Sequence, residues 1–351
     1  MTMSDRNAQR KSIYVVLGMP RSGTSAVTRG LKALGIDLGD HFGAGTNKWN
    51  PTGYWEDHDI VHKINRGVSY ALNDTWMSVH LINDECRNNP ALDLLKQSAV
   101  KLLRERMSHS EHWGFKDPRT CRILPFWQDV FTALNVNEHY ILALRNPLAS
   151  AASWQKLSGA DIELGLLVWL AHLIPAVDDM RGKKCVVVSY EAMLQDPRKE
   201  LERIKNGLDI PTLTTSADTD AYVEGFLDKK LQHHSFDDDS LKSHPAIVVA
   251  PLCAVIYDLL MKVARDEMTL ESKSFASAWK NIKTEFSELY PAYCYLNTLL
   301  KRNKELEREL RTIRRSIPWK IILPLRIIDN SLRFFRRTLR DKRKLLKAYE
   351  T

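Results

Sequence analysis

Residues 12–25 read SIYVVLGMPRSGTS, and this stretch decides the fold class. Residues 12–17 are a short, β-branched, apolar run that ends at Gly18, which predicts a buried strand. Residues 22–34 carry apolar side chains at helical spacing and are followed by Gly35, a plausible helix stop. The stretch therefore predicts a strand, a glycine-containing turn and a helix in succession.

The succession of strand and helix recurs further along the chain. The apolar runs YILAL at residues 140–144 and CVVV at residues 185–188 predict two more buried strands, and each precedes a helix-like segment, at residues 148–157 and 197–208. WGFK, at residues 113–116, predicts another strand. Buried strands that alternate with helices indicate an α/β fold, in which a parallel sheet is flanked by helices on both faces.

The other segments are mainly helical in pattern. Residues 57–72 and 92–107 have helical spacing, and residues 222–289 are predicted to be largely helical. A change in composition near residue 290 predicts a first domain at residues 10–290 and a helical C-terminal extension at residues 291–351.

The net charge of +8 conceals an asymmetry along the 351 residues. Residues 301–351 hold 17 Lys and Arg against 6 Asp and Glu, so the remainder of the chain has a net charge of −3. This distribution excludes nucleic-acid binding by the whole protein. The five cysteines are widely spaced and form no CxxC pair, which argues against a zinc site or a disulfide framework. With no signal peptide and no membrane span in the pattern, we expect a cytoplasmic protein.

The turn after the first predicted strand has the spacing of a phosphate-binding loop. Gly18 and Gly23 are arranged as GxxxxG, but Thr24 and Ser25 follow where a Walker A loop would have Lys and Ser or Thr. The cation has moved inside the loop, to Arg21. A kinase neutralises the charge of a triphosphate with that Lys and a metal ion. A sulfuryl group carries less charge, so backbone amides, hydroxyls and one or two side-chain cations can suffice to bind it. The alternative is a fortuitous glycine-rich turn.

A second motif follows the YILAL strand. RNPLASAAS places Arg145 at the strand end and Ser153 in the second turn of the next predicted helix, on the face that looks back to the strand end. A guanidinium and a hydroxyl so placed could hold one phosphate from two sides. In isolation, Arg145 would be interpreted as a surface ion-pair residue and Ser153 as a surface serine.

These residues carry a family resemblance. PRSGTS resembles the 5′-phosphosulfate loop of sulfotransferases that use 3′-phosphoadenosine 5′-phosphosulfate (PAPS), with Arg21 in place of the usual Lys. RNPLASAAS resembles their 3′-phosphate motif, and residues 186–204, VVVSYEAMLQDPRKELERI, resemble a third segment whose Tyr, here Tyr190, commonly lies near the adenine. The glycine-rich RKGxxG segment of the cytosolic branch is absent, and Lys229 or Lys230 is a weak substitute for it.

The resemblance implies a P-loop NTPase-like sulfotransferase fold, PAPS as co-substrate and no metal. The residues that it assigns to PAPS binding are Arg21, Ser22, Gly23, Thr24, Ser25, Arg145, Ser153 and Tyr190.

The catalytic residues are expected at the same edge of the sheet. Arg21 and Lys116, which ends a predicted strand, would stabilise charge on the bridging oxygen. The histidine base of cytosolic sulfotransferases is excluded, because its position here is Pro118. NPTGYWEDHD, at residues 50–59, offers Glu56 as the base, in the way that carbohydrate-acting members take a glutamate from a comparable segment. Its rivals are Asp57, His58 and Asp117. Alternatively, Glu56 and Asp57 only cap the helix that follows.

The acceptor is expected to be a cell-surface glycan or glycolipid, because Trp49, Tyr54, Trp55 and Trp76 suit stacking on sugar rings, although core packing explains such side chains equally well. Two other functions remain open: an ATP-dependent small-molecule kinase, and a catalytically inactive, membrane-associated nucleotide-binding protein.

The tail supplies the basic charge. Residues 297–311 place leucines among charged residues, which predicts a solvated helix or a short coiled coil. Residues 325–339 form an apolar stripe flanked by Arg and Lys, typical of a helix on an anionic membrane surface. The alternative is a homo-oligomer formed through the tail. The PWK…PLR pattern of residues 318–326 resembles the C-terminal ends of bacterial enzymes that modify cell-surface glycans.

Overall fold

The computed structural model describes residues 10–43, 53–87, 89–225, 236 and 238–316. The chain divides into two compact units, Met1–Tyr293 and Cys294–Thr351. The sheet and all predicted site residues belong to the first unit. The domain boundary predicted after residue 290 falls within helix α13 (Lys273–Arg315).

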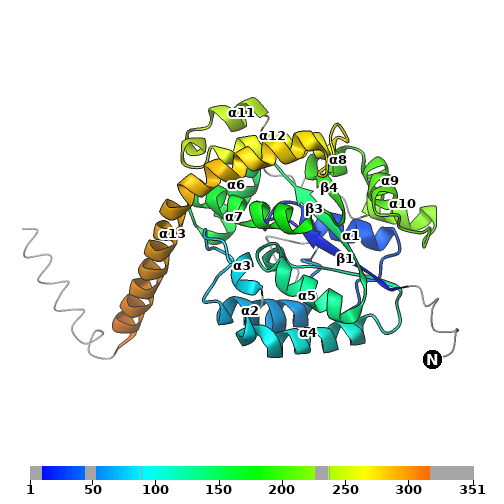
Figure 1. Ribbon diagram of the computed structural model, residues 1–351, viewed down its shortest axis with the longest axis horizontal. Coiled ribbons are helices and arrows are strands. Elements are labelled where there is room, and N and C mark those ends of the chain that lie inside the picture. Colours follow the sequence, from blue (N-terminus) through cyan, green and yellow to red (C-terminus); the bar gives the residue numbers. More distant parts are fainter. Residues whose placement is uncertain (1–9, 44–52, 88, 226–235, 237, 317–351) are drawn as a thin grey trace, which may run out of the picture. The chain divides into compact units, whose positions relative to one another are not determined.

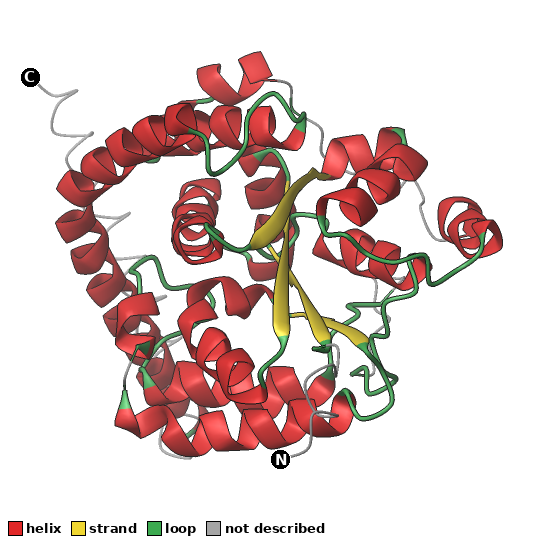
Figure 2. Cartoon of the chain, turned by 45° about the vertical axis from the view of Figure 1, so that its right-hand side comes forward, coloured by secondary structure: helices red, strands yellow, loops and turns green. Residues whose placement is uncertain are grey.

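The core of the first unit is a four-stranded, all-parallel sheet (Figure 2). Its strands are β1 (Ser12–Leu17), β2 (His112–Lys116), β3 (Asn137–Leu144) and β4 (Lys184–Ser189), in the order β2-β1-β3-β4. All six residues of β1 are buried, as its unbroken apolar pattern predicts. Val16 is paired with Lys116 on one side and with Ile141 on the other, so the carboxyl ends of β1, β2 and β3 meet at one edge.

Helices cover both faces of this sheet, which confirms the predicted fold class (Figure 1). Tyr14 and Val16 point to one face, where they pack in a core with α1, α8, α9 and α10. Phe115 points to the other face, where its ring lies 4.9 Å from that of Trp127 in α5. Helix α12 also packs on β3 and β4, and α7 packs on α5 and α12. The bounds of these helices are α1 Thr24–Ala33, α5 Leu124–Leu134, α7 Ile162–Met180, α8 Tyr190–Gln195, α9 Pro197–Gly207, α10 Ser216–Gly225 and α12 Leu252–Ala264.

Helix α7 is rich in apolar residues and almost wholly buried, so it belongs to the core of the first unit. No single helix in the described ranges is long and apolar enough to cross a membrane. Only α6 (Pro147–Ser158) and α7 taken together match such a span, with a bend of 114° between them.

The helix predicted over residues 57–72 is confirmed, but its central part is a π-helix instead of an α-helix. The structure forms a π-helix, η2 (Ile60–Asn65), followed by α2 (Arg66–Ala71). The wide turn accompanies an inward-pointing, buried Asn65, whose amide nitrogen donates to Asp117 Oδ2 (2.9 Å) and Thr120 Oγ1 (3.2 Å). Its amide oxygen accepts from Trp127 Nε1 at 2.9 Å. Asn65 thereby fixes the turn η4 (Pro118–Arg122) that follows β2.

Two other predicted helical regions are confirmed. Residues 92–107 contain α4 (Asp93–Arg106), and the described part of residues 222–289 is mainly helical, as predicted. The first part of α13 packs in the first unit, where Trp279 Nε1 donates to Asp178 Oδ1 at 2.7 Å. The shorter elements are α3 (Asn83–Cys86), η3 (Pro90–Leu92), α11 (Asp238–Ser243) and η6 (Pro245–Val249).

Candidate active site

The turn between β1 and α1 exposes backbone N–H groups at a helix N-terminus. Arg21 (φ 73°) and Gly23 (φ 82°) adopt left-handed conformations, and the Ser22 N–H closes the turn on Met19 O at 3.1 Å. No side chain of the described residues caps α1. The first N–H groups of a helix have no intrahelical partner and favour an anion. The turn therefore offers hydrogen-bond donors that suit an anion.

Gly23 is required by a close approach from another strand end. A Cβ atom at this position would lie 2.1 Å from Cδ2 of Tyr190. Tyr190 starts α8 directly after β4, and Ser189 caps this helix by accepting a hydrogen bond from the Ala192 N–H at 3.3 Å. The other neighbour of the ring is Arg145, whose Cζ lies 4.8 Å from the ring centroid. The ring of Tyr190 therefore contacts both predicted phosphate motifs.

The structure brings the two motifs into hydrogen-bond contact. Arg21 Nε donates to Ser153 Oγ at 3.0 Å, and Arg145 Nη1 donates to Arg21 O at 3.0 Å. Arg145 lies beside the turn after β1 because it directly follows β3, the neighbour of β1 in the sheet. Ser153 lies in the second turn of α6. A further pair, Ser22 Oγ and Ser150 Oγ at 3.1 Å, joins the same two segments. Sequence reasoning missed Ser150, although its spacing of one helical turn from Ser153 was a usable signal.

The electrostatics of this cluster favour an anion. Burial lowers the pKa of both Arg21 and Arg145, which means that their charged forms are poorly solvated. Arg21 forms no ion pair with a carboxylate of the described residues. A bound phosphate would offset the cost of two partly buried guanidinium charges. No group of three or more His, Cys, Asp or Glu in the described ranges could hold a metal ion.

A carboxylate and an ammonium group form a pair beside the loop. Lys116 Nζ donates to Glu56 Oε1 at 2.7 Å, and the Lys116 side chain is only 2% exposed. Burial raises the pKa of Glu56, while the positive charge of Lys116 opposes this rise. The segment before Glu56 contacts α1, because Ser25 Oγ donates to Tyr54 O at 3.3 Å. The predicted base and the second predicted cation are thus direct partners.

Asp57 has a structural role. Its Oδ1 accepts the N–H groups of Asp59 (2.9 Å) and Ile60 (3.0 Å), so Asp57 caps the helical segment that begins at His58 and continues as η2. Its Oδ2 accepts from Arg106 Nε at 2.8 Å. Of the two residues that could have served only as caps, Asp57 does so, whereas the Glu56 side chain bonds to Lys116.

The other rivals are also engaged or directed elsewhere. Asp117 is fully buried and accepts hydrogen bonds from the Asn65 side chain and from both the backbone and the guanidinium of Arg119. His58 is more than half exposed; its ring lies 3.5 Å from the Asp59 carboxylate and 4.4 Å, between centroids, from His62. Of the four candidate bases, Glu56 therefore has the environment that best suits a base.

The predicted sugar-stacking residues lie in different environments. Trp55 packs against the core beside α1, with the Arg29 guanidinium carbon 5.5 Å from its ring centroid, so core packing accounts for it. Trp76 is half-buried and makes an edge contact with Trp154, with centroids 5.7 Å apart. Trp49, Lys229 and Lys230, and the tail residues 317–351 lie outside the described residues.

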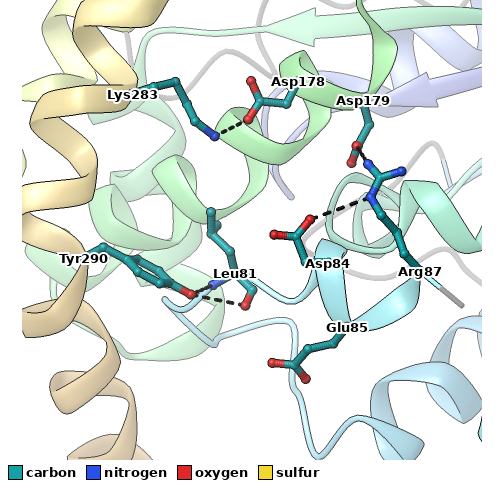
Figure 3. A pocket seen from close by; sticks show the side chains of 8 residues that line it. All are labelled: Leu81, Asp84, Glu85, Arg87, Asp178, Asp179, Lys283 and Tyr290. Carbon is teal, nitrogen blue, oxygen red and sulfur yellow. Dashed lines mark hydrogen bonds and ion pairs between the residues drawn. The ribbon is translucent and has the colours of Figure 1, made fainter. Parts of the chain in front are cut away.

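A separate hollow of about 450 Å³ lies away from all these residues (Figure 3). Its charged groups are mostly paired with one another: Arg87 bonds to Asp179 and Asp84, and Lys283 bonds to Asp178. Tyr290 of α13 bonds to the backbone of Leu81. These contacts attach α13 to α7 and to the segment before α3, so the hollow lies between packed elements whose charges are compensated.

Comparisons with known proteins identify a family and similar solved structures. Residues 14–215 match the family described as "Sulfotransferase family". Two solved structures are similar in part: the sulfotransferase domain from the Synechococcus PCC 7002 olefin synthase (16% identity, TM-score 0.39, covering 82% of this chain and 98% of that chain), and the sulfotransferase domain from the curacin biosynthetic pathway (15% identity, TM-score 0.38, covering 80% and 99%). A comparison with curated proteins gives no match.

Proposed function

The chain belongs to the sulfotransferase family, and from this premise we propose that it transfers a sulfuryl group from PAPS to a hydroxyl of a cell-surface glycan or glycolipid. The observation that carries the proposal is the contact among Arg21, Arg145 and Ser153. It joins an anion-binding helix N-terminus to a second cation–hydroxyl pair, which is the arrangement that a nucleotide with two separate anionic ends requires.

The donor is recognised through both ends. The loop amides, with Ser22, Thr24 and Ser25, hold the 5′-phosphosulfate, because N–H and O–H donors converge at the start of α1. Arg145 and Ser153 hold the 3′-phosphate by a charge-assisted fork and a hydroxyl. Tyr190, whose ring contacts both motifs, lies near the adenine of the donor.

Transfer proceeds by in-line displacement. The acceptor oxygen attacks sulfur, its proton passes to the Glu56 carboxylate, and the sulfur–oxygen bond to the 5′-phosphate breaks. The products are the sulfate ester and adenosine 3′,5′-bisphosphate. Arg21 and Lys116 stabilise the negative charge that develops on the leaving oxygen. Lys116 also donates a hydrogen bond to Glu56, so the same residue positions the base and stabilises the leaving group.

The acceptor class is supported by Tyr54 and Trp76, half-buried aromatic residues of the kind that stack on sugar rings. An acceptor at the inner face of a membrane fits the apolar stripe of residues 325–339 with its flanking Arg and Lys side chains. Deletion of residues 317–351 should release the protein from anionic vesicles while nucleotide binding persists. If the full chain does not bind such vesicles at low salt, the membrane part of the proposal is wrong.

Calorimetry tests the donor. We titrate the protein with adenosine 3′,5′-bisphosphate, adenosine 5′-phosphate and ATP, each with and without magnesium. The proteins are the wild type, Arg145→Ala and a matched control, Arg104→Ala, which removes an exposed guanidinium from α4. We expect the bisphosphate to bind best without metal, and only Arg145→Ala to abolish its advantage over the monophosphate. Equal affinities for those two ligands would refute the proposal, and magnesium-dependent preference for ATP would favour a kinase. Bisphosphate binding without sulfation of any glycan would indicate an inactive protein.

A further inference from the structure

The described part of the second unit is helical and carries a stripe of exposed apolar side chains. Leu299, Leu306 and Ile313 recur every seven residues, and Leu310 follows Leu306 by four. These four side chains are 44–51% exposed. In heptad notation Leu299, Leu306 and Ile313 occupy d, and Leu296 and Leu310 occupy a. This is the seam by which one helix packs along another.

The stripe is distinct from the face that α13 buries in the first unit. That face consists of Phe275, Trp279, Ile282 and Phe286, which fall at a and e in the same frame. The d positions that precede Leu299 hold Ala278, Glu285 and Ala292. The d seam therefore starts only where the second unit starts, and core packing of the first unit does not account for it.

One polar residue interrupts the seam. Asn303 occupies the a position between Leu296 and Leu310 and is exposed. An Asn at a single a position is satisfied when it faces its own counterpart, so it selects a parallel, in-register pair at some cost in stability. In an antiparallel pair the a positions face d positions, and Asn303 would be buried against an apolar side chain.

The flanking charges are complementary to a second copy of the same helix. Position g holds Arg302 and Glu309, and position e holds Glu307 and Arg314. In a parallel pair each g residue faces the e residue five positions later in the partner. Arg302 then faces Glu307, and Glu309 faces Arg314, in both directions across the seam. These four residues form no ion pair with any described residue of their own chain.

We propose that residues 296–313 form a parallel, two-stranded coiled coil with a second copy of this chain. The segment spans about 27 Å at 1.5 Å per residue, which is short for an isolated coiled coil. Here the helix is already nucleated, because α13 begins at Lys273 and its first part is packed in the first unit. Each copy thus avoids the main cost of starting a helix.

Sedimentation velocity of the full chain, at physiological salt and up to about 100 µM, tests the dimer. Leu306→Lys should leave a monomer. Glu309→Arg and Arg314→Glu should each weaken the dimer about tenfold, because each places like charges across the seam. Mixing the two variants should restore it, since in the mixed dimer opposite charges again face each other in both directions. Arg308→Glu, a reversal at the outward-facing f position, is the matched control and should not change the dimer.

Cross-linking tests the orientation. In a Cys294→Ser background, Asn303→Cys should form a disulfide-linked dimer on mild oxidation, because only a parallel, in-register pair brings the two a positions together. Arg308→Cys should not cross-link. A monomer throughout the concentration range, a trimer or larger assembly, a dimer that survives Leu306→Lys, or failure of the mixed charge variants to associate would each overturn the proposal. Circular dichroism of every variant distinguishes loss of association from loss of folding.

Discussion

Arg21 Nε and Ser153 Oγ lie 3.0 Å apart, although 132 positions separate them in the chain. Arg21 lies in the turn after β1, and Ser153 lies in α6, the helix that follows the neighbouring strand β3. Each is therefore positioned by the other, and Arg145 adds a hydrogen bond to the Arg21 carbonyl. The groups that we propose to recognise the two ends of the nucleotide are already in mutual contact, which is the preorganisation that favours tight binding.

The first prediction concerns this contact. Ser153→Ala should lower the affinity for adenosine 3′,5′-bisphosphate about tenfold or more, because hydrogen bonds to charged groups contribute about 1.5–3 kcal/mol. The free energy of unfolding should change by less than about 1 kcal/mol, since Ser153 is half-buried. Calorimetry and denaturant unfolding measure the two effects. Ser158→Ala, later in α6, is the control and should bind normally; equal affinity of both variants would contradict the prediction.

The second prediction compares two glycines with the same backbone conformation. Gly23 (φ 82°) and Gly159 (φ 73°) are both left-handed, but a Cβ at Gly159 would meet nothing within 4 Å, whereas at Gly23 it would overlap Tyr190. Gly159→Ala should cost about 1–2 kcal/mol of stability from backbone strain alone. Gly23→Ala should cost more, and should also lower nucleotide affinity by displacing the ring.

Denaturant unfolding measures the stability of these two glycine variants, and titration with the bisphosphate measures their nucleotide affinity. If they lose equal stability and bind equally well, the contact between Gly23 and Tyr190 has no energetic importance.

The strand-and-loop framework was predictable because its signals are local. Buried parallel strands are unbroken apolar runs, so residues 12–17, 140–144 and 185–188 all fall inside observed strands. Arg145 and Ser153 could be paired from sequence because one follows a strand and the other lies in the helix after it. The close approach of Tyr190 to Gly23 could not, since it depends on how β4 lies in the sheet.

The acceptor side was less predictable because its contacts are distant in sequence. The π-helix η2 ends at Asn65, which bonds to residues 52, 55 and 62 positions away, and an apolar period cannot report such distant contacts. The distinction between Glu56 and Asp57 depends on Lys116 and Arg106, supplied by β2 and α4. Two adjacent carboxylates look alike in sequence, and only tertiary partners separate the cap Asp57 from Glu56, which pairs with Lys116.

The third prediction concerns pH. Glu56 accepts a proton only as a carboxylate, and burial raises its pKa above the ordinary value of 4.5. Sulfuryl transfer should therefore fall as the pH is lowered through this raised pKa. Lys116→Met removes the charge that opposes the rise, so the acid limb of the kcat/KM profile should move to higher pH. Glu56→Gln should lower kcat by about a hundredfold or more.

Controls for the pH profile come from neighbouring groups. Lys63→Met removes an exposed cation that pairs with Asp59, and should leave the acid limb in place. His58→Ala tests the rival base. Disappearance of the limb in His58→Ala, with an unchanged profile in Glu56→Gln, would transfer the role of base to His58.

The fourth prediction concerns Arg106, a positioning residue. Its guanidinium holds Asp57 at 2.8 Å and Asp59 at 2.9 Å, and Asp57 directly follows Glu56 in the chain. Arg106→Met should leave the buried Asp57 carboxylate without its cation and release the segment that carries Glu56. We expect kcat to fall about tenfold or more, because small displacements of a base are costly. The KM for PAPS should hardly change, since α4 supplies none of the proposed donor-binding residues.

Arg104→Met is the matched control for Arg106, because it removes an exposed guanidinium two residues away on the same helix. Arg106→Lys should restore part of kcat, since an ammonium group can pair with one of the two carboxylates but cannot bind both in the same fork. Steady-state kinetics with PAPS and acceptor varied separately give kcat and both KM values. An unchanged kcat in Arg106→Met, or an equal loss in Arg104→Met, would show that the Asp57 clamp does not position the base.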